Sequence, residues 1–242
     1  MPYRIFLAGA AGAIGKRLTP LLRDAGHSVV GTTRSQTKTE ELRSLGADPV
    51  VVDVFDAAAL TDAVKAARPD IVIHQLTDLP RILDPAVMGE ARVRNARLRR
   101  EGTRNLVAAA VAAGVRRFIA QSIAWAYAPG SEPHSESDPL DTAARGDQAV
   151  SVGGVIALET AVSGTQAFEG IILRYGQLYG PGTSYDKPTG IVPVHVDAAA
   201  YAALLALDRG KPGAFNVAEP NAYARTTKAA GELGWSADLR LP

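Results

Sequence analysis

A glycine-rich turn near the start of the chain restricts the possible folds more than any other feature. Gly9, Gly12 and Gly15 follow an apolar run over residues 3–8 and precede an amphipathic stretch over residues 14–25. Glycines at this spacing permit a tight turn and a close approach of backbone N–H groups to a pyrophosphate, which the helix N-terminus also attracts. The pattern predicts a dinucleotide-binding turn, with an ordinary strand–helix turn as the alternative. The residues expected to contact the phosphates are Gly9, Ala11, Gly12, Ala13, Ile14 and Gly15.

Short apolar runs alternate with longer amphipathic stretches over the first 174 residues. The runs are rich in Val, Ile or Phe, and we expect strands at residues 3–8, 28–33, 49–53, 70–74, 116–122 and 169–174. Helices are expected at residues 14–25, 38–45, 57–66, 87–113 and 149–163. Strands that alternate with helices indicate a parallel sheet covered on both faces. The chain is therefore predicted to be an α/β protein with a Rossmann-type doubly wound parallel sheet.

The composition changes after Arg174. Residues 175–193 are rich in Gly and Pro, so we predict that they are mostly loop. A helix at residues 197–207, a strand at 214–217 and a last helix at 226–233 are expected to follow. Residues 1–174 are predicted to form a dinucleotide-binding domain. Residues 175–242 are predicted to form a reduced C-terminal region on the substrate side, interleaved with the core in a single compact unit.

Composition limits the partners of the chain. Its 242 residues include no Cys and four widely separated His, a pattern that offers no metal site. The formal net charge of +1 argues against nucleic acid as a partner. No apolar run is long enough to predict a membrane-spanning helix, and the amino terminus lacks the layout of a signal peptide. We expect a cytoplasmic protein that binds a small-molecule substrate.

Residues after the second and third expected strands bear on the choice of cofactor. Where an NAD site would carry an acidic residue, this chain has Thr33 and Arg34. Because a guanidinium can bind a 2′-phosphate bidentately and stack on adenine, we predict NADP in preference to NAD. A solvated loop cation is the alternative for Arg34. Asp53, followed by Val54, is placed either to bind the adenine amino group or to cap the following helix.

Six segments in the same order match a known set of motifs. Residues 9–15 match a G-x-x-G-x-x-G turn, residues 70–77 a D-x-V-x-H-x-A-A strand, and residues 102–106 a G-T-x-N-L helix. Residues 173–182, 195–197 and 232–235 are similar to L-R-x-x-x-x-Y-G-P-G, H-V-D-D and E-L-G-W. Together they resemble the extended short-chain dehydrogenase/reductase family of NAD(P)-dependent epimerases and dehydratases, over nearly the whole chain.

The resemblance implies more contacts than the glycine turn supplies. The further cofactor contacts that it implies come from Gln75, Leu76, Thr77, Ser122, Tyr175 and Gly176. The residues that we expect on the substrate side are Arg99, Gln177 and Tyr179.

The resemblance breaks at the residues that carry the family's chemistry. That chemistry uses a Ser or Thr, a Tyr that acts as acid and base, and a Lys four residues later that lowers the pKa of the Tyr. With Glu159 as the anchor of the alignment, the Tyr position holds Ser151 and the Lys position holds Val155. Ile123 occupies the Ser position, one residue after Ser122. No Tyr in the chain is followed four residues later by Lys.

The sequence leaves the proton donor open. The candidate catalytic residues are Ser122, Tyr127 and Ser151, with Tyr175, Tyr179, His134, Glu136 and Asp138 as further possibilities. A packed aromatic residue is the alternative for Tyr127. We predict an epimerase/dehydratase-like NAD(P)-dependent oxidoreductase that acts on a small carbonyl, alcohol or sugar-type substrate through a non-standard proton donor. The competing prediction is a catalytically silent NADP(H)-binding redox sensor or scaffold.

Two expected helices suggest an oligomer. Six arginines crowd residues 87–113, which indicates a solvated face, a substrate phosphate site near Arg99, or salt bridges between subunits. Residues 149–163 carry one charge, that of Glu159, so this helix should be covered on more than one side. Because the resembling family pairs these helices across a two-fold axis, we predict an isologous homodimer through residues 87–113 and 149–163.

Overall fold

A seven-stranded parallel sheet forms the centre of the molecule in the computed structural model, which describes residues 1–80 and 84–241. Its strand order is β3-β2-β1-β4-β5-β6-β9, so the order reverses between β1 and β4. The strands are β1 (Arg4–Ala8), β2 (Ser28–Thr33), β3 (Asp48–Val51), β4 (Ile71–His74), β5 (Arg117–Ile123), β6 (Glu169–Tyr175) and β9 (Gly213–Val217). This topology confirms the predicted Rossmann-type fold.

Strand β1 is apolar on both of its faces because both faces of the sheet are covered there. Along β1, Ile5 and Leu7 belong to one buried cluster, and Phe6 and Ala8 belong to another. Successive side chains of a strand point to opposite faces, so a strand buried on both sides must be apolar at every position. The register aligns Ile5 with Val29 on β2 and with Ile71 on β4.

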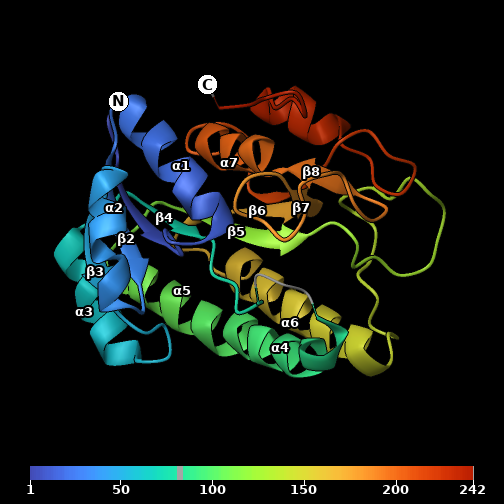
Figure 1. The fold of residues 1–242 in the computed structure, drawn as a ribbon, viewed down its shortest axis with the longest axis horizontal. Helices are drawn as coiled ribbons and strands as arrows, with labels where there is room; N and C mark the ends of the chain where they lie inside the picture. Colours follow the sequence, from blue (N-terminus) through green and yellow to red (C-terminus); the bar gives the residue numbers. More distant parts are fainter. Residues whose placement is uncertain (81–83, 242) are drawn as a thin grey trace.

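Helices form the outer layers. Figure 1 shows α1 and α7 on one side of the sheet and α5 and α6 on the other, with α4 packed along α6. The helices are α1 (Ala13–Asp24), α2 (Thr39–Ser44), α3 (Ala57–Ala67), α4 (Pro85–Arg97), α5 (Thr103–Ala112), α6 (Gly146–Ser163) and α7 (Val196–Leu205). Within the described residues, no helix has both the length and the apolar character needed to cross a bilayer.

The expected single helix over residues 87–113 is interrupted. A π-helical turn, Leu98–Gly102, separates α4 from α5. Such a turn inserts one residue into the helical repeat and rotates the side chains that follow, so the charged pattern does not lie on one solvated face. Arg99 is consequently buried, whereas Arg97 and Arg100 on either side of it are exposed.

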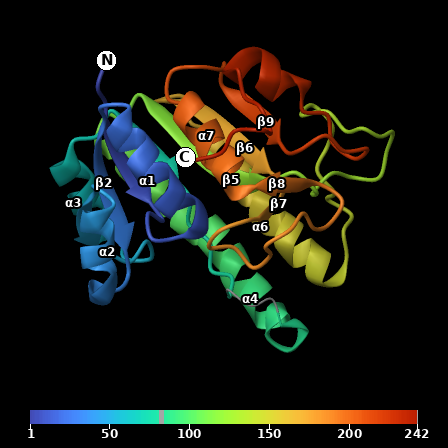
Figure 2. The ribbon, with the colours of Figure 1, turned by 45° about the horizontal axis from the view of Figure 1, so that its top comes forward.

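Residues 175–193 are mostly irregular, as predicted, but one short strand lies within them and a second begins at their last residue. β7 (Gln177–Tyr179) pairs in parallel with β8 (Pro193–His195). The main chains also approach closely beside this pair, because a Cβ on Gly176 would lie 2.2 Å from the Val192 carbonyl oxygen. Figure 2 shows β7 and β8 beside the end of β5. Strands of three residues give no periodic signal, and their pairing joins distant positions.

The polar segment 129–145 folds against the C-terminal part of the chain. Figures 1 and 2 show this yellow-green segment next to orange and red segments. The His134 N–H donates to the Tyr223 carbonyl at 2.7 Å, and His134 bridges to Ala224. The last expected helix is shorter, ending in a π-helical turn, Ala229–Leu233. β9 and α7 share the main core with β1, while the division into residues 1–174 and 175–242 stays a prediction.

Candidate functional site

A cleft of about 1010 Å³ opens at the carboxyl ends of the strands. It spans the reversal of strand order between β1 and β4, the position where open parallel sheets bind ligands. The predicted site residues that line the cleft are Gly9, Ala11, Gly12, Ala13, Thr33, Arg34, Val54, Gln75, Leu76, Thr77, Arg99, Ser122, Ser151, Tyr175, Gly176 and Gln177. Eight predicted residues do not line it: Ile14, Gly15, Asp53, Tyr127, His134, Glu136, Asp138 and Tyr179.

The glycine turn has the geometry that close packing requires. Gly9 has a left-handed backbone with a φ of +91°, and the Gly12 N–H donates to its carbonyl at 3.0 Å. A Cβ on Gly15 would lie 2.3 Å from the same carbonyl oxygen, so only glycine fits there. Gly15 and Ile14 therefore serve helix packing. No side chain caps the N-terminus of α1, whose first N–H groups are left for a ligand, as a bound dinucleotide pyrophosphate requires.

The end of the cleft beyond β2 carries positive charge. Thr33, Arg34, Ser35 and Lys38 line it, and both Arg34 and Lys38 are exposed. Arg34 approaches Asp78 at 3.5 Å, and Asp78 is the one carboxylate among the described lining residues. Lys38 was not among the residues predicted from the sequence, which placed it at the start of a helix.

The turn after β3 contributes apolar contacts. Val54 lines the cleft, whereas the exposed Asp53 does not and instead accepts a hydrogen bond from the Phe55 N–H at 2.9 Å. Asp56 caps α3 by accepting from the Ala59 N–H at 3.0 Å. The alternative that Asp53 caps this helix is therefore wrong.

Gln75 and Tyr175 join the ends of β4 and β6 at the floor of the cleft. Gln75 Nε2 donates to the Tyr175 hydroxyl at 3.2 Å, and both side chains are buried. Burial raises the pKa of Tyr175 above its usual range, although the hydrogen bond from Gln75 opposes the shift. Gln75 Oε1 is buried without a hydrogen-bond partner among the described residues. An orphaned acceptor of this kind suits a ligand N–H or O–H, and it fits a bound dinucleotide.

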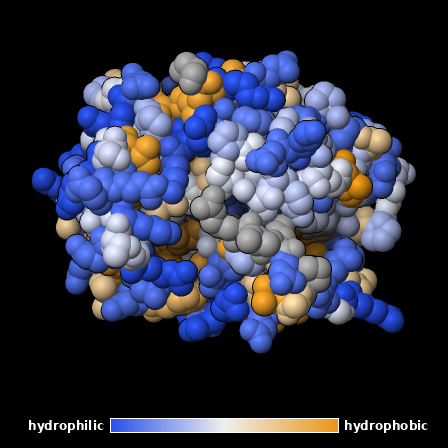
Figure 3. All heavy atoms as spheres, in the orientation of Figure 1, coloured by the Kyte–Doolittle hydropathy of each residue, from blue (hydrophilic) through white to orange (hydrophobic). Residues whose placement is uncertain are grey.

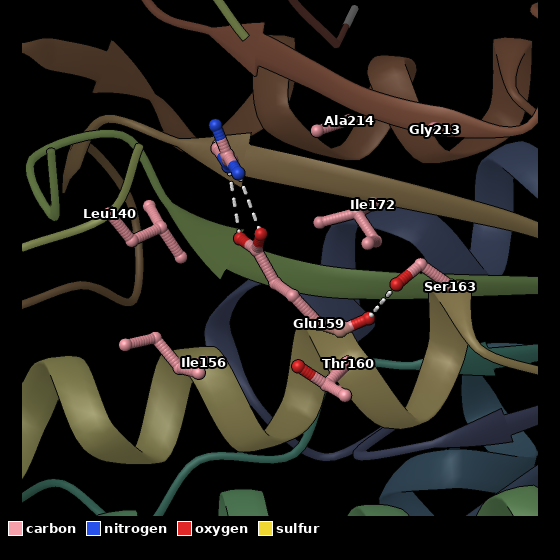
Figure 4. Close-up of a pocket in the computed structure, with 9 residues that line it drawn as sticks. Leu140, Ile156, Glu159, Thr160, Ser163, Ile172, Gly213 and Ala214 are labelled. Atoms are coloured by element: carbon pink, nitrogen blue, oxygen red, sulfur yellow. Dashed lines mark hydrogen bonds and ion pairs between the residues drawn. The ribbon is translucent and has the colours of Figure 1, made fainter. Parts of the chain in front are cut away.

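Ser122 belongs to a buried charged group. Its hydroxyl donates to Glu159 Oε1 at 2.6 Å, and Arg174 binds the same carboxylate through Nε at 3.0 Å and Nη2 at 2.7 Å. Figure 4 shows the Glu159 carboxylate pointing from α6 toward the sheet, where two dashed lines join it to a guanidinium. The Ser122 proton is thus committed to Glu159.

Tyr127 lies apart from the cleft residues. It is buried, its hydroxyl donates to Asn216 Oδ1 at 2.7 Å, and it accepts from Arg174 Nη1 at 2.8 Å. Burial raises its pKa, against the opposing charge of Arg174. His134, a further candidate proton donor, stacks on its ring at 4.9 Å and is buried as well. The packed-aromatic alternative describes the position of Tyr127.

The two positions aligned with Tyr and Lys have different surroundings. Ser151 lines the cleft. Val155 is fully buried and packs with Ala126 and Val152 in a small apolar cluster outside the cleft. On the substrate side, Gln177 lines the cleft, whereas the Tyr179 hydroxyl donates to the Glu219 carboxylate away from it.

Several lining residues were missed by sequence reasoning. They are Lys16, Trp125 and the loop residues Gly182, Thr183, Ser184, Tyr185 and Thr189. The Gly and Pro content of this loop marked it as irregular but gave no sign that it lies over the cleft. Lys16 directly follows the glycine turn and forms an ion pair with Glu41.

A smaller pocket of about 270 Å³ lies between α6 and the sheet. Figure 4 shows its lining, in which Leu140, Ile156 and Ile172 surround the Glu159 carboxylate. None of the glycine-turn residues line it, so a ligand held by that turn would occupy the larger cleft. Across residues 1–80 and 84–241, no group of three His, Asp or Glu is arranged to hold a metal ion.

Comparison with known proteins assigns the family. The NAD dependent epimerase/dehydratase family matches residues 5–212, and the chain belongs to this family. A 3-diazoavenalumate denitrifying reductase from Streptomyces sp. is 40% identical over 238 residues, which cover 89% of this chain and 76% of that protein.

Solved structures agree on the fold. A UDP-glucose 4-epimerase from Thermotoga maritima with UDP-glucose has a TM-score of 0.80 at 18% identity, covering 98% of this chain and 94% of that one. The enzyme WbmH from Bordetella bronchiseptica, in complex with NAD+, has a TM-score of 0.70 at 21% identity, covering 92% and 77%.

Proposed function

We propose that this protein is an NAD(P)H-dependent reductase that passes hydride to a small substrate without taking a proton from a Tyr–Lys pair. The proposal rests on where the structure places the two residues that align with the family's Tyr and Lys. Ser151 keeps a place on the cleft, while Val155 is core. A bound nicotinamide supplies the hydride, and the chain supplies binding and orientation.

Two of the hydroxyls that line the cleft, those of Ser122 and Tyr175, are poor sources of a proton. Ser122 donates to Glu159, and burial raises the pKa of Tyr175. Tyr185 lines the cleft from an exposed loop position. A carbonyl that accepts hydride becomes an alkoxide and needs a proton, which is the service that the Tyr–Lys pair gives. The absence of this Tyr–Lys pair favours a substrate whose reduction needs no proton.

The name of the Streptomyces relative suggests such a substrate class. An aryl diazonium ion that accepts one hydride gives the arene and N₂: the C–N bond breaks, a C–H bond forms, and the hydride supplies both electrons. No proton is consumed, so the step balances without a general acid. We therefore propose an aryl diazonium compound as the substrate class, and NADPH as the reductant because Arg34 and Lys38 line the ribose end of the cleft.

Paired substrates test this function. NADPH deuterated on one face of the nicotinamide is offered with para-carboxybenzenediazonium and, separately, with para-formylbenzoate. The expected result is benzoate that carries deuterium from one face only, release of N₂, and little turnover of the aldehyde. A Gly12→Glu variant, whose carboxylate would repel the pyrophosphate, measures the uncatalysed background. Equal catalysis of the aldehyde, or loss of diazonium turnover in Tyr185→Phe, would overturn the proposal.

The second candidate function is the catalytically silent NADP(H) sensor or scaffold. It is favoured by the same loss of titrating groups, since neither Ser151 nor Val155 can replace the missing pair. Its signature in the same experiment is tight binding of NADPH with no turnover of either substrate above the Gly12→Glu background.

The predicted homodimer and the cytoplasmic location stay predictions. α6 is covered on one side by α4, and Val87 and Val93 on α4 are exposed. Figure 3 shows a mainly hydrophilic face with small, separate hydrophobic patches. We propose that the dimer forms through α4 and α6, and light scattering at micromolar concentration tests it. A monomer there would refute the homodimer.

A further inference from the structure

One arginine of the cleft wall is buried and has no counter-ion within residues 1–80 and 84–241. Arg99 is 6% exposed and lines the cleft from the π-helical turn between α4 and α5. Its side chain passes over α6 at Gly154, where a Cβ would lie 3.4 Å from Arg99 Cδ. Ser151, one turn earlier on α6, lines the same cleft. The close packing at Gly154 therefore holds the Arg99 side chain against α6.

Nothing in residues 1–80 and 84–241 neutralises this charge. Arg99 makes no ion pair and no side-chain hydrogen bond within this part of the chain. The nearest acid in electrostatic terms is Glu159, which is already bound by Arg174 and Ser122. Burial lowers the pKa of Arg99 to about 10, with Glu159 opposing the shift, so Arg99 stays charged at neutral pH. The one nearby carboxylate is thus taken by Arg174 and does not pair with Arg99.

The neighbouring histidine does not supply a negative partner either. His74 is buried, accepts from the Leu76 N–H through Nδ1 at 3.2 Å, and directs Nε2 at the Thr103 hydroxyl at 2.9 Å. Burial, with a smaller contribution from the charge of Arg99, lowers the pKa of His74 to about 4. The imidazole is therefore neutral, and Arg99 keeps its full charge beside it.

We propose that Arg99 binds a carboxylate group of the substrate, an inference that rests on the reductase function above. A buried guanidinium without a partner is costly, and a planar carboxylate can accept two parallel hydrogen bonds from it. The pyrophosphate of the cofactor belongs to the glycine turn at β1, so it does not account for Arg99. Arg92, another arginine of the cleft wall, is paired with Asp147. A single guanidinium that has no ion pair among the described residues matches one monoanion better than the diphosphate of a nucleotide sugar.

Calorimetry on the NADP+-saturated protein tests this assignment. The probes are para-formylbenzoate, its methyl ester, and UDP-glucose, each titrated into wild type, Arg99→Met, Arg99→Lys and Arg100→Met. Arg100 is the matched control because it lies on the same helical turn but is exposed. We expect Arg99→Met to weaken carboxylate binding about thirtyfold or more, Arg99→Lys to restore part of it, and Arg100→Met to change nothing. The ester should bind weakly to every variant.

Thermal unfolding of the ligand-free protein gives a second readout. Arg99→Met removes an unpaired buried charge, so we expect its Tm to rise, whereas a purely structural Arg99 would make the Tm fall. Addition of para-formylbenzoate should raise the Tm of the wild-type protein and should leave the Tm of Arg99→Met unchanged.

Each contrary result has a distinct meaning. Equal binding of acid and ester to wild type, or equal binding of the acid to wild type and Arg99→Met, would overturn the assignment. If UDP-glucose binds and its binding depends on Arg99, the group that Arg99 recognises is a diphosphate, and the carboxylate assignment is wrong. Failure to bind NADP(H) would refute the reductase function alone, because the carboxylate titration can be repeated on the cofactor-free protein.

Discussion

The hydroxyl of Ser122 donates to the carboxylate of Glu159 across 2.6 Å, from the end of β5 to the middle of α6. This bond turns the Ser122 proton away from the cleft and leaves the hydroxyl lone pairs for a ligand. Ser122, which lies one residue before the expected catalytic position, is thus oriented to accept a hydrogen bond from a ligand. The same carboxylate holds Arg174, so the orientation of Ser122 depends on a buried ion pair.

Replacing Glu159 should destabilise the protein strongly. Glu159→Gln leaves the buried guanidinium of Arg174 without its counter-charge, and we expect the free energy of unfolding to fall by about 3–5 kcal/mol. Urea denaturation measures the change. Glu101→Gln, which removes the exposed pair with Arg97, is the control and should cost less than about 1 kcal/mol. A similar small loss for both variants would contradict the role given to the buried pair.

Two adjacent glycines of α6 should respond in opposite ways to the same substitution. A Cβ on Gly154 would lie 2.9 Å from Ala96 Cα, so Gly154→Ala must push α4 away from α6, at a cost of about 1–3 kcal/mol. Gly153 is exposed with open space around it, and Gly153→Ala should gain about 0.5–1 kcal/mol from helix propensity. Thermal unfolding of both variants decides; equal stability would argue against the close approach of the helices.

His74 should make the stability depend on pH. Burial lowers its pKa to about 4, whereas the unfolded chain takes up the proton near the ordinary value of 6.5. Between these values the unfolded state binds one proton more, so stability is complete above pH 6.5 and falls as the pH is lowered toward 4. The expected loss is about 3 kcal/mol in total.

Urea midpoints of wild type and His74→Asn over this pH range isolate the contribution of His74. The variant should be less stable at neutral pH and should lose less stability on acidification. Parallel pH curves for the two proteins would show that another group causes the dependence. In Arg99→Met, the pKa of His74 should rise, since the charge of Arg99 is one of the causes that lower it.

Arg34 should decide between the two nicotinamide dinucleotides. If it binds the 2′-phosphate, Arg34→Met weakens NADPH binding about ten- to a hundredfold and leaves NADH binding within about twofold. Fluorescence titration with both cofactors measures this. Arg43→Met is a suitable control, because Arg43 is a cation of the neighbouring helix α2 and does not line the cleft. An equal effect of Arg34→Met on both cofactors would contradict the preference for NADP.

Local sequence patterns predicted the strands because burial on both faces selects apolar residues within each short segment. A strand covered on both faces is apolar at every residue, as residues 5–8 are, and this leaves a readable signal. The glycine turn was readable in part for a similar reason, since Gly15 is required by contacts with the backbone of residues 9 and 10 and Gly9 by its positive φ, although Gly9 also lies against the distant backbone of Gln75. Val54 was expected from its place after a strand, whereas Gln75 was implied by the resemblance to the family.

The charges of the site could not be assigned in the same way. Ser122, Glu159 and Arg174 lie on three separate elements, and only the folded chain brings them together. Arg99 is buried on a π-helical turn, and no residue pattern in the sequence distinguishes such a turn from an ordinary helix. Tyr127 follows β5 as expected, yet it pairs with Leu140 and packs away from the cleft.

The small β7–β8 ladder has a consequence for how such proteins diversify. It fastens both ends of the loop over residues 180–192 with three residue pairs, and side chains of that loop form part of the cleft wall. The segment is thus an exchangeable module: its length and residues can change while the strands beneath keep their register. New substrate preferences can arise there without a new scaffold, and grafting this one segment between relatives should carry a preference with it.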